Sequence, residues 1–91
     1  MTAKAQDILG DASHIMKRRG VTYGDANILF ENIAARFSLV LGQRITTYEC
    51  ARLLAELKLA RLDLGYQYDS VVDAINYLAL GGALQNGKKE E

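Results

Sequence analysis

The 91-residue chain contains no proline, one cysteine and one histidine, and its eleven basic residues balance its eleven acidic residues. Cys50 alone cannot form an internal disulfide, and its apolar neighbours predict a small core residue rather than a nucleophile. His14 alone cannot supply a histidine metal cluster, and no Ser/His/Asp arrangement is evident around it. A net charge of zero gives no electrostatic reason to expect nucleic acid as a partner.

Long apolar runs are also missing. No run approaches the roughly 18 residues that a membrane-spanning helix needs, and the N-terminus begins with polar residues rather than a signal peptide. We therefore expect no membrane partner and a reducing cytoplasm as the location. Hydrophobic residues make up 49% of the chain, which is typical of a globular protein. The expected organisation is one helical domain over residues 1–86 and a solvated C-terminal tail over residues 87–91.

Glycines punctuate the chain and indicate where helices end. The expected helices span residues 3–19, 26–41, 47–64 and 69–84. Gly20, Gly42 and Gly65 stand just beyond the first three of them. Thr46 and Glu49 have the spacing of a capping box at the start of the third helix. Side chains suited to N-caps stand at the start of the other three helices: Thr2, Asp25 and Asp69.

The short connections make neighbouring helices antiparallel, so the predicted fold class is all-α, a compact bundle of about four short helices. The helix over residues 26–41 has two apolar faces, which predicts a central position or a subunit contact. The main face comprises Ala26, Leu29, Phe30, Ile33, Phe37, Val40 and Leu41. Ile28, Ala35 and Leu39 form a second strip, and Leu80 and Leu84 lie on the polar side of the fourth helix. These apolar residues predict a homodimer or higher even oligomer, with Ile28, Leu39, Leu80 and Leu84 as interface candidates.

Two cations project from the apolar side of the third helix. Lys58 and Arg61 are costly there unless they are paired. Asp69 and Asp73 on the fourth helix are candidate partners, and we expect Arg61 to contact one of them or Asp25. One interpretation is a buried clamp that fixes the hairpin. A second is a polar pocket in which the cations hold an anion such as phosphate and the two aspartates hold a metal. The third is a pair of long side chains that reach solvent.

Several motifs in order resemble a family of small domains of unknown function from phages and prophages. They are Tyr23-Gly24-Asp25, Leu57-Lys58-Leu59-Ala60-Arg61 and Asp69-Ser70-Val71-Val72-Asp73. The resemblance covers about residues 15 to 80. It implies a phage or prophage origin and a place in the cytoplasm of a bacterial host. It also implies a role for the charged members of these motifs and for Tyr23.

A more distant similarity is to the MazG-like all-α nucleotide pyrophosphohydrolases, which bind Mg²⁺ through four carboxylates on two helices. Asp69 and Asp73 resemble part of their second metal helix, but Ser70 stands where a carboxylate is needed. We therefore expect a non-enzymatic helical oligomer without a cofactor, which binds a host protein or a small anionic ligand in host takeover or counter-defence. The alternative is a nucleotide-binding or Mg²⁺-dependent pyrophosphohydrolase-like domain. It would use Lys58 and Arg61 for phosphate and the two aspartates for the metal.

Overall fold

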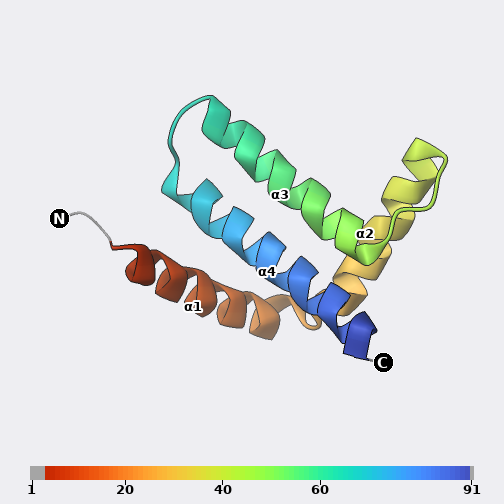
Figure 1. Cartoon of the computed structure of the whole chain (residues 1–91), viewed down its shortest axis with the longest axis horizontal. Coiled ribbons are helices and arrows are strands. Elements are labelled where there is room, and N and C mark those ends of the chain that lie inside the picture. The colour runs from red at the N-terminus through yellow and green to blue at the C-terminus, as the bar shows by residue number, and fades with distance from the viewer. Residues whose placement is uncertain (1–3, 91) are drawn as a thin grey trace.

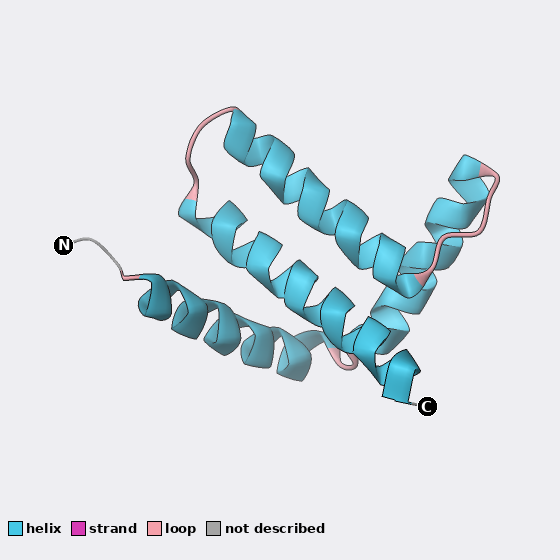
Figure 2. Cartoon of the chain, viewed as in Figure 1, coloured by secondary structure: helices cyan, strands magenta, loops and turns pink. Residues whose placement is uncertain are grey.

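The computed structural model describes residues 4–90, without the side chains of Tyr23 and of residues 88–90. Its four helices are α1 (Ala5–Tyr23), α2 (Ala26–Leu41), α3 (Thr47–Asp63) and α4 (Tyr68–Glu90). Within residues 4–90 the chain has no strand (Figure 2). The prediction of an all-α bundle of four helices is confirmed. None of these helices combines the length and the apolar character that crossing a membrane requires.

The ends of α2 and α3 follow the predicted signals. Asp25 caps α2 by accepting a hydrogen bond from the backbone N–H of Asn27 at 2.8 Å, and Gly42 ends it in the left-handed conformation at φ 70°. The capping box of α3 is confirmed, because the Thr46 hydroxyl and the Glu49 carboxylate each accept from the other's backbone N–H. These hydrogen bonds lower the pKa of Glu49.

Three predicted boundaries are wrong or fall elsewhere. Gly20 does not end α1, which continues to Gly24, where φ is +83°. Asp69 is not the N-cap of α4, because the helix already begins at Tyr68. The same helix runs on to Glu90, so residues 87–90, which were predicted to be a solvated tail, belong to it. The predicted cap Thr2 lies outside the described residues.

Small side chains explain why α3 and α4 form the closest pair of helices. The two helices run antiparallel along most of their length (Figure 1). Their shared face carries Ala51 and Ala55 from α3 and Ser70 and Ala74 from α4, all at most 5% exposed. At Gly81 the approach is so close that a Cβ would stand 2.9 Å from the Cβ of Ala51. The antiparallel hairpin predicted from the short loop is confirmed.

The hydrophobic core lies where α2 crosses the N-terminal end of α3 and the C-terminal half of α4 (Figure 1). Phe30 and Ala34 of α2 are buried against Cys50 of α3, whose thiol pKa is raised by burial. The prediction of Cys50 as a core residue is confirmed. Leu80 and Leu84 of α4 pack against this core. They were predicted to lie at a subunit interface, and the structure instead uses them to cover Phe30 and its neighbours.

Much of the apolar surface of α2 is left exposed by the residues that the structure describes. Leu29, Val40 and Leu41 are 45%, 83% and 58% exposed, so the main predicted face is buried only at its centre. The second strip is exposed as well, with Ile28 at 68% and Leu39 at 84%. The reason is geometric, because α2 lies at the periphery and crosses the hairpin instead of running along it (Figure 1).

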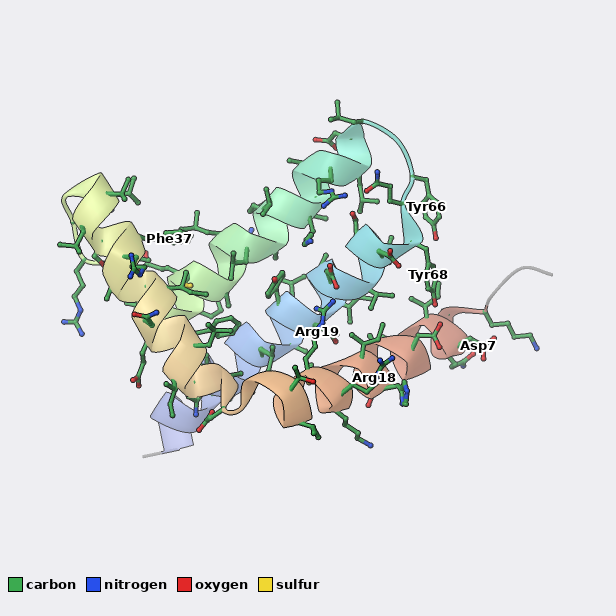
Figure 3. All side chains as sticks on the ribbon, turned by 180° about the vertical axis from the view of Figure 1, so that it is seen from behind. Asp7, Arg18, Arg19, Phe37, Tyr66 and Tyr68 are labelled. Carbon is green, nitrogen blue, oxygen red and sulfur yellow. The ribbon has the colours of Figure 1, made fainter. Side chains whose placement is uncertain are left out.

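The first helix, α1, lies beside α4 and has a thin apolar contact with it. Ala12 is 2% exposed, whereas Ile8, Ile15 and Met16 are half-buried. A polar contact reinforces the outer end of this pair, because the Tyr68 hydroxyl donates a hydrogen bond to the Asp11 carboxylate. Figure 3 shows Tyr68 pointing from the start of α4 towards α1.

The Tyr68–Asp11 contact predicts a dependence on alkaline pH. The hydrogen bond to Asp11 is the main cause that raises the pKa of Tyr68 to about 12, above its ordinary value near 10. The stability from this contact is therefore fully present below pH 10 and is lost as the pH rises towards 12. In a spectrophotometric titration, one tyrosine should ionise at a higher pH than the others. Tyr68→Phe should remove this high-pH step. Tyr66→Phe is the matched control; if it removed the high-pH step instead, the assignment would be wrong.

Candidate functional site

A pocket of about 490 Å³ opens where the C-terminal end of α1 meets the other three helices. Its polar lining consists of Arg19, Asp25, Lys58, Asp73, Asn76 and Tyr77. Its remaining lining consists of Met16, Gly20, Gly24, Ala26, Leu29, Phe30 and Leu80. All four helices and the turn between α1 and α2 therefore contribute to this one pocket.

Asp73 holds the polar side of the pocket together. One of its carboxylate oxygens lies 3.0 Å from Lys58 Nζ on α3, and the other lies 3.1 Å from an Arg19 guanidinium nitrogen on α1. The Lys58 and Asp73 side chains are only 17% and 13% exposed, whereas Arg19 is 49% exposed. Figure 3 shows Arg19 reaching from α1 towards α4. One carboxylate thus serves two cations and joins three helices.

Lys58 is placed here by the periodicity of α3. It follows Ala51 and Ala55 on the stripe that packs against α4, at a spacing of three to four residues. Lys58 is mostly buried and paired with Asp73, one of the two candidate partners named from the sequence. The Asp73 carboxylate, 3.0 Å from Lys58 Nζ, offsets the cost of placing the ammonium group in this largely buried position.

Asn76 supplies an unsatisfied hydrogen-bond donor. Its residue is 5% exposed, and the amide nitrogen Nδ2 is buried without a hydrogen-bond partner. Buried polar groups are hydrogen-bonded in the great majority of cases, so such a donor requires an explanation. Asn76 lines the pocket one turn beyond Asp73 on α4, so a molecule in the pocket could supply the missing acceptor.

The rest of the pocket lining includes apolar and aromatic side chains. The ring of Phe30 on α2 lies 6.4 Å from the ring of Tyr77 on α4, at an interplanar angle of 47°. Met16, Leu29 and Leu80 extend this wall. A pocket with both cations and an aromatic wall in its lining can bind a molecule that has both a charged and an apolar part.

The turn between α1 and α2 forms the rim. Gly24 has a φ of +83°, a conformation that L side chains rarely adopt, and so allows the chain to reverse into Asp25. The Asp25 carboxylate is engaged as the cap of α2. Both residues line the pocket. The side chain of Tyr23 lies outside the described part of the structure.

The predicted role of Arg61 is wrong as regards its burial and contacts. Arg61 is exposed, and its guanidinium donates a hydrogen bond to the Gln67 side chain at 3.2 Å. No ion pair joins Arg61 to an aspartate within residues 4–90. The reason is its position in the last turn of α3, next to the loop that carries Gln67. Arg19 takes the place that the prediction gave to Arg61.

Asp69 also lies away from the pocket. It is exposed in the first turn of α4, while Asp73 already has a cation at each of its two oxygens. A metal bound by this pair would have to displace Lys58 or Arg19. The part of the chain that the structure describes contains no group of three or more His, Cys, Asp or Glu side chains placed to hold a metal ion.

Two important site residues were not among the predicted ones. Arg19 was expected to be the last residue of the first helix, just before Gly20, and no role in a site was predicted for it. No role was predicted for Asn76 either. The available signal was that Asp73, Asn76 and Tyr77 share one side of α4 at spacings of three and four residues. A second cation near Asp73 could not be identified without knowing that α1 packs against α4.

Comparison with protein families assigns most of the chain to one family. Residues 7–85 match a domain of unknown function, DUF6378, and the chain belongs to this family. The match confirms that the resemblance is to a family of unknown function. No curated protein and no solved structure is significantly similar to the chain.

Proposed function

We propose that this member of the DUF6378 family binds a small organic anion in the pocket between its four helices. The observation that carries the proposal is the Asn76 side chain, because its buried Nδ2 has no hydrogen-bond partner and Asn76 lines the same pocket as two cations. An orphaned buried donor costs about 1–3 kcal/mol. A ligand oxygen at this position would remove that cost.

The hydrogen-bonding groups that line the pocket favour an anion as the ligand. Both oxygens of Asp73 contact cations, and one oxygen of Asp25 accepts from the backbone of α2. Lys58 has three N–H donors and Arg19 has five, so each has donors left after its contact with Asp73. The groups left without partners are therefore mostly donors, which a carboxylate or phosphate would satisfy.

The size and the aromatic wall favour an organic ligand over a bare ion. A volume of about 490 Å³ lies within the range of about 300–1,000 Å³ that is typical of small-molecule pockets. The Phe30–Tyr77 wall would contact an apolar or aromatic part of the ligand. The proposed role is binding without catalysis.

The wider biological role rests on the sequence resemblance alone. A phage or prophage accessory function, in host takeover or counter-defence, remains a proposal, as does a host-protein partner. The nucleotide-hydrolase alternative would share only Lys58 and Asp73 with this pocket, because Arg61 and Asp69 do not line it, and it differs in requiring Mg²⁺. A common set of probes therefore separates the two.

Thermal denaturation with defined probes tests the proposal. Suitable probes are inorganic phosphate, phenyl phosphate and AMP, each with and without Mg²⁺. A probe present at 100 times its dissociation constant should stabilise the protein by about 2.7 kcal/mol, which raises the melting temperature of so small a domain by more than 10 °C, at about 4–8 °C per kcal/mol. We expect phenyl phosphate and AMP to act without Mg²⁺ and to exceed phosphate. A strict Mg²⁺ requirement would favour the nucleotide-hydrolase alternative.

Asn76→Leu provides the decisive variant. Leucine has nearly the same size and removes the unsatisfied donor, so the ligand-free protein should melt at the same temperature or higher. The shift produced by phenyl phosphate or AMP should disappear. Asp69→Asn, on the same helix but outside the pocket, should keep the full shift. The proposal fails if no probe shifts the melting temperature, or if Asn76→Leu retains the wild-type response.

A further inference from the structure

The outward face of α2 carries an apolar strip that is left exposed by the described part of the chain, residues 4–90. Ile28 is 68% exposed and Leu39 is 84% exposed. At 100° per residue, these two residues lie on the side of the helix opposite Phe30 and Phe37, which face the core. The strip therefore points away from the rest of the bundle.

The amount of exposed surface indicates that a partner covers part of the chain. The accessible surface is 6773 Å², whereas a monomeric globular protein of 10.0 kDa exposes about 5,200 Å². The excess of about 1,500 Å² exceeds the roughly 800 Å² that each partner buries in a stable interface. The radius of gyration, 14.2 Å, is likewise above the value of about 12 Å for a compact domain of this length.

The strip has the spacing of a short heptad pattern. Ile28, Asn32, Ala35 and Leu39 follow one another at intervals of four, three and four residues, which assigns them to alternating d and a positions. Asn32 then occupies an a position at the centre. A single asparagine there is a known determinant of register and of the two-stranded state.

The charges beside the strip distinguish the possible arrangements. Glu31 and Arg36 flank it on opposite sides and are five residues apart, at g and e positions. In a parallel pair, a g position lies opposite the e position that follows it in the other helix, so each Glu31 faces an Arg36 of the second copy. In an antiparallel pair centred on the strip, Glu31 would face Glu31. Neither residue forms an ion pair within residues 4–90.

We infer that α2 packs in parallel against α2 of a second copy of this chain, with Ile28 and Leu39 in the contact and Glu31–Arg36 pairs on both sides. This inference is independent of the proposed ligand pocket, because neither Ile28 nor Leu39 lines that pocket. It retains two of the four interface residues predicted from the sequence. Leu80 and Leu84, which pack inside the chain, are not part of it.

The oligomeric state of the full chain is the first test. Sedimentation equilibrium should show a dimer for the wild type at micromolar concentration and a monomer for Leu39→Asp. Leu57→Asp is the matched control, because Leu57 is also exposed, at 55%, but lies on α3. It should remain dimeric. A monomeric wild type, or a dimer that Leu57→Asp disrupts and Leu39→Asp does not, would overturn the inference.

Charge exchange tests the parallel register. Glu31→Arg and Arg36→Glu should each weaken dimerisation about tenfold, because each places like charges on both sides of the strip. The doubly exchanged variant should recover the wild-type affinity, and an equimolar mixture of the two single variants should form heterodimers. Affinities that do not respond to these changes would contradict the register.

Cross-linking then fixes the direction of the second helix. In the parallel pair, Leu39→Cys places two cysteines side by side, and they should form a disulfide under mild oxidation. In an antiparallel pair the same two positions lie about 16 Å apart along the axis, too far for a disulfide. The native Cys50 is 0% exposed and does not compete. A dimer without this cross-link would exclude the parallel arrangement.

Discussion

Replacing Asp73 with alanine is expected to lower the free energy of unfolding by about 3 kcal/mol, because it leaves a largely buried Lys58 without its counter-charge. Asp73 contacts Lys58 at 3.0 Å and Arg19 at 3.1 Å, so one substitution breaks both ion pairs. A domain of this length has only about 5–14 kcal/mol of stability. Urea denaturation followed by circular dichroism measures the loss.

Asp69→Ala is the matched control for this measurement. Asp69 precedes Asp73 by one turn on the same helix, but it is exposed. Its loss removes only a favourable charge from the first turn of α4, at a cost of no more than about 1 kcal/mol. If the two variants were equally stable, the Lys58–Asp73–Arg19 cluster would contribute little to folding.

Replacing Gly81 with leucine is expected to cost about 3 kcal/mol by separating α3 from α4. A Cβ at this position would stand 2.9 Å from the Cβ of Ala51 and 3.6 Å from the Tyr48 ring. A contact this short forces the helices apart, and overpacking of this kind costs about 1–3 kcal/mol or more. The buried contacts along the hairpin would weaken with it. The melting temperature of the variant reports the loss.

Replacing the adjacent residue, Gly82, is expected to change the stability in the opposite direction. A Cβ at Gly82 meets no atom within 4 Å, so Gly82→Ala should only improve helix propensity and stabilise the protein by about 0.5–1 kcal/mol. Combining Gly81→Ala with Ala51→Gly exchanges the two partners and should recover part of the loss of Gly81→Ala. Equal effects at Gly81 and Gly82 would contradict a close approach at Gly81.

Local signals in the sequence were sufficient for α2, α3 and their caps. The Thr46–Glu49 box, the Asp25 cap and Gly42 act within a few residues of the chain, so their hydrogen bonds do not depend on the rest of the fold. The burial of Lys58 also follows from the chain, because a cation on an apolar stripe of a helix requires a partner. These features were predicted and are confirmed.

Features that depend on packing between distant helices were not predictable in the same way. The sequence did not determine which cation reaches Asp73, because Arg19 and Arg61 lie on helices whose placement relative to α4 is a property of the whole fold. The continuation of α1 beyond Gly20 depends on the turn at Gly24. The orphaned Nδ2 of Asn76 is visible only once its neighbours are in place.

The attachment of α1 has a consequence for ligand binding. Its apolar contact with α4 is thin, and polar contacts hold it near both ends, Tyr68–Asp11 at one and Arg19–Asp73 at the other. Elements with few buried apolar contacts open locally at low free-energy cost. Because α1 supplies Met16 and Arg19 to the pocket, a ligand there would contact the least firmly held helix and the hairpin together. Its binding free energy would then also reduce the local opening of α1.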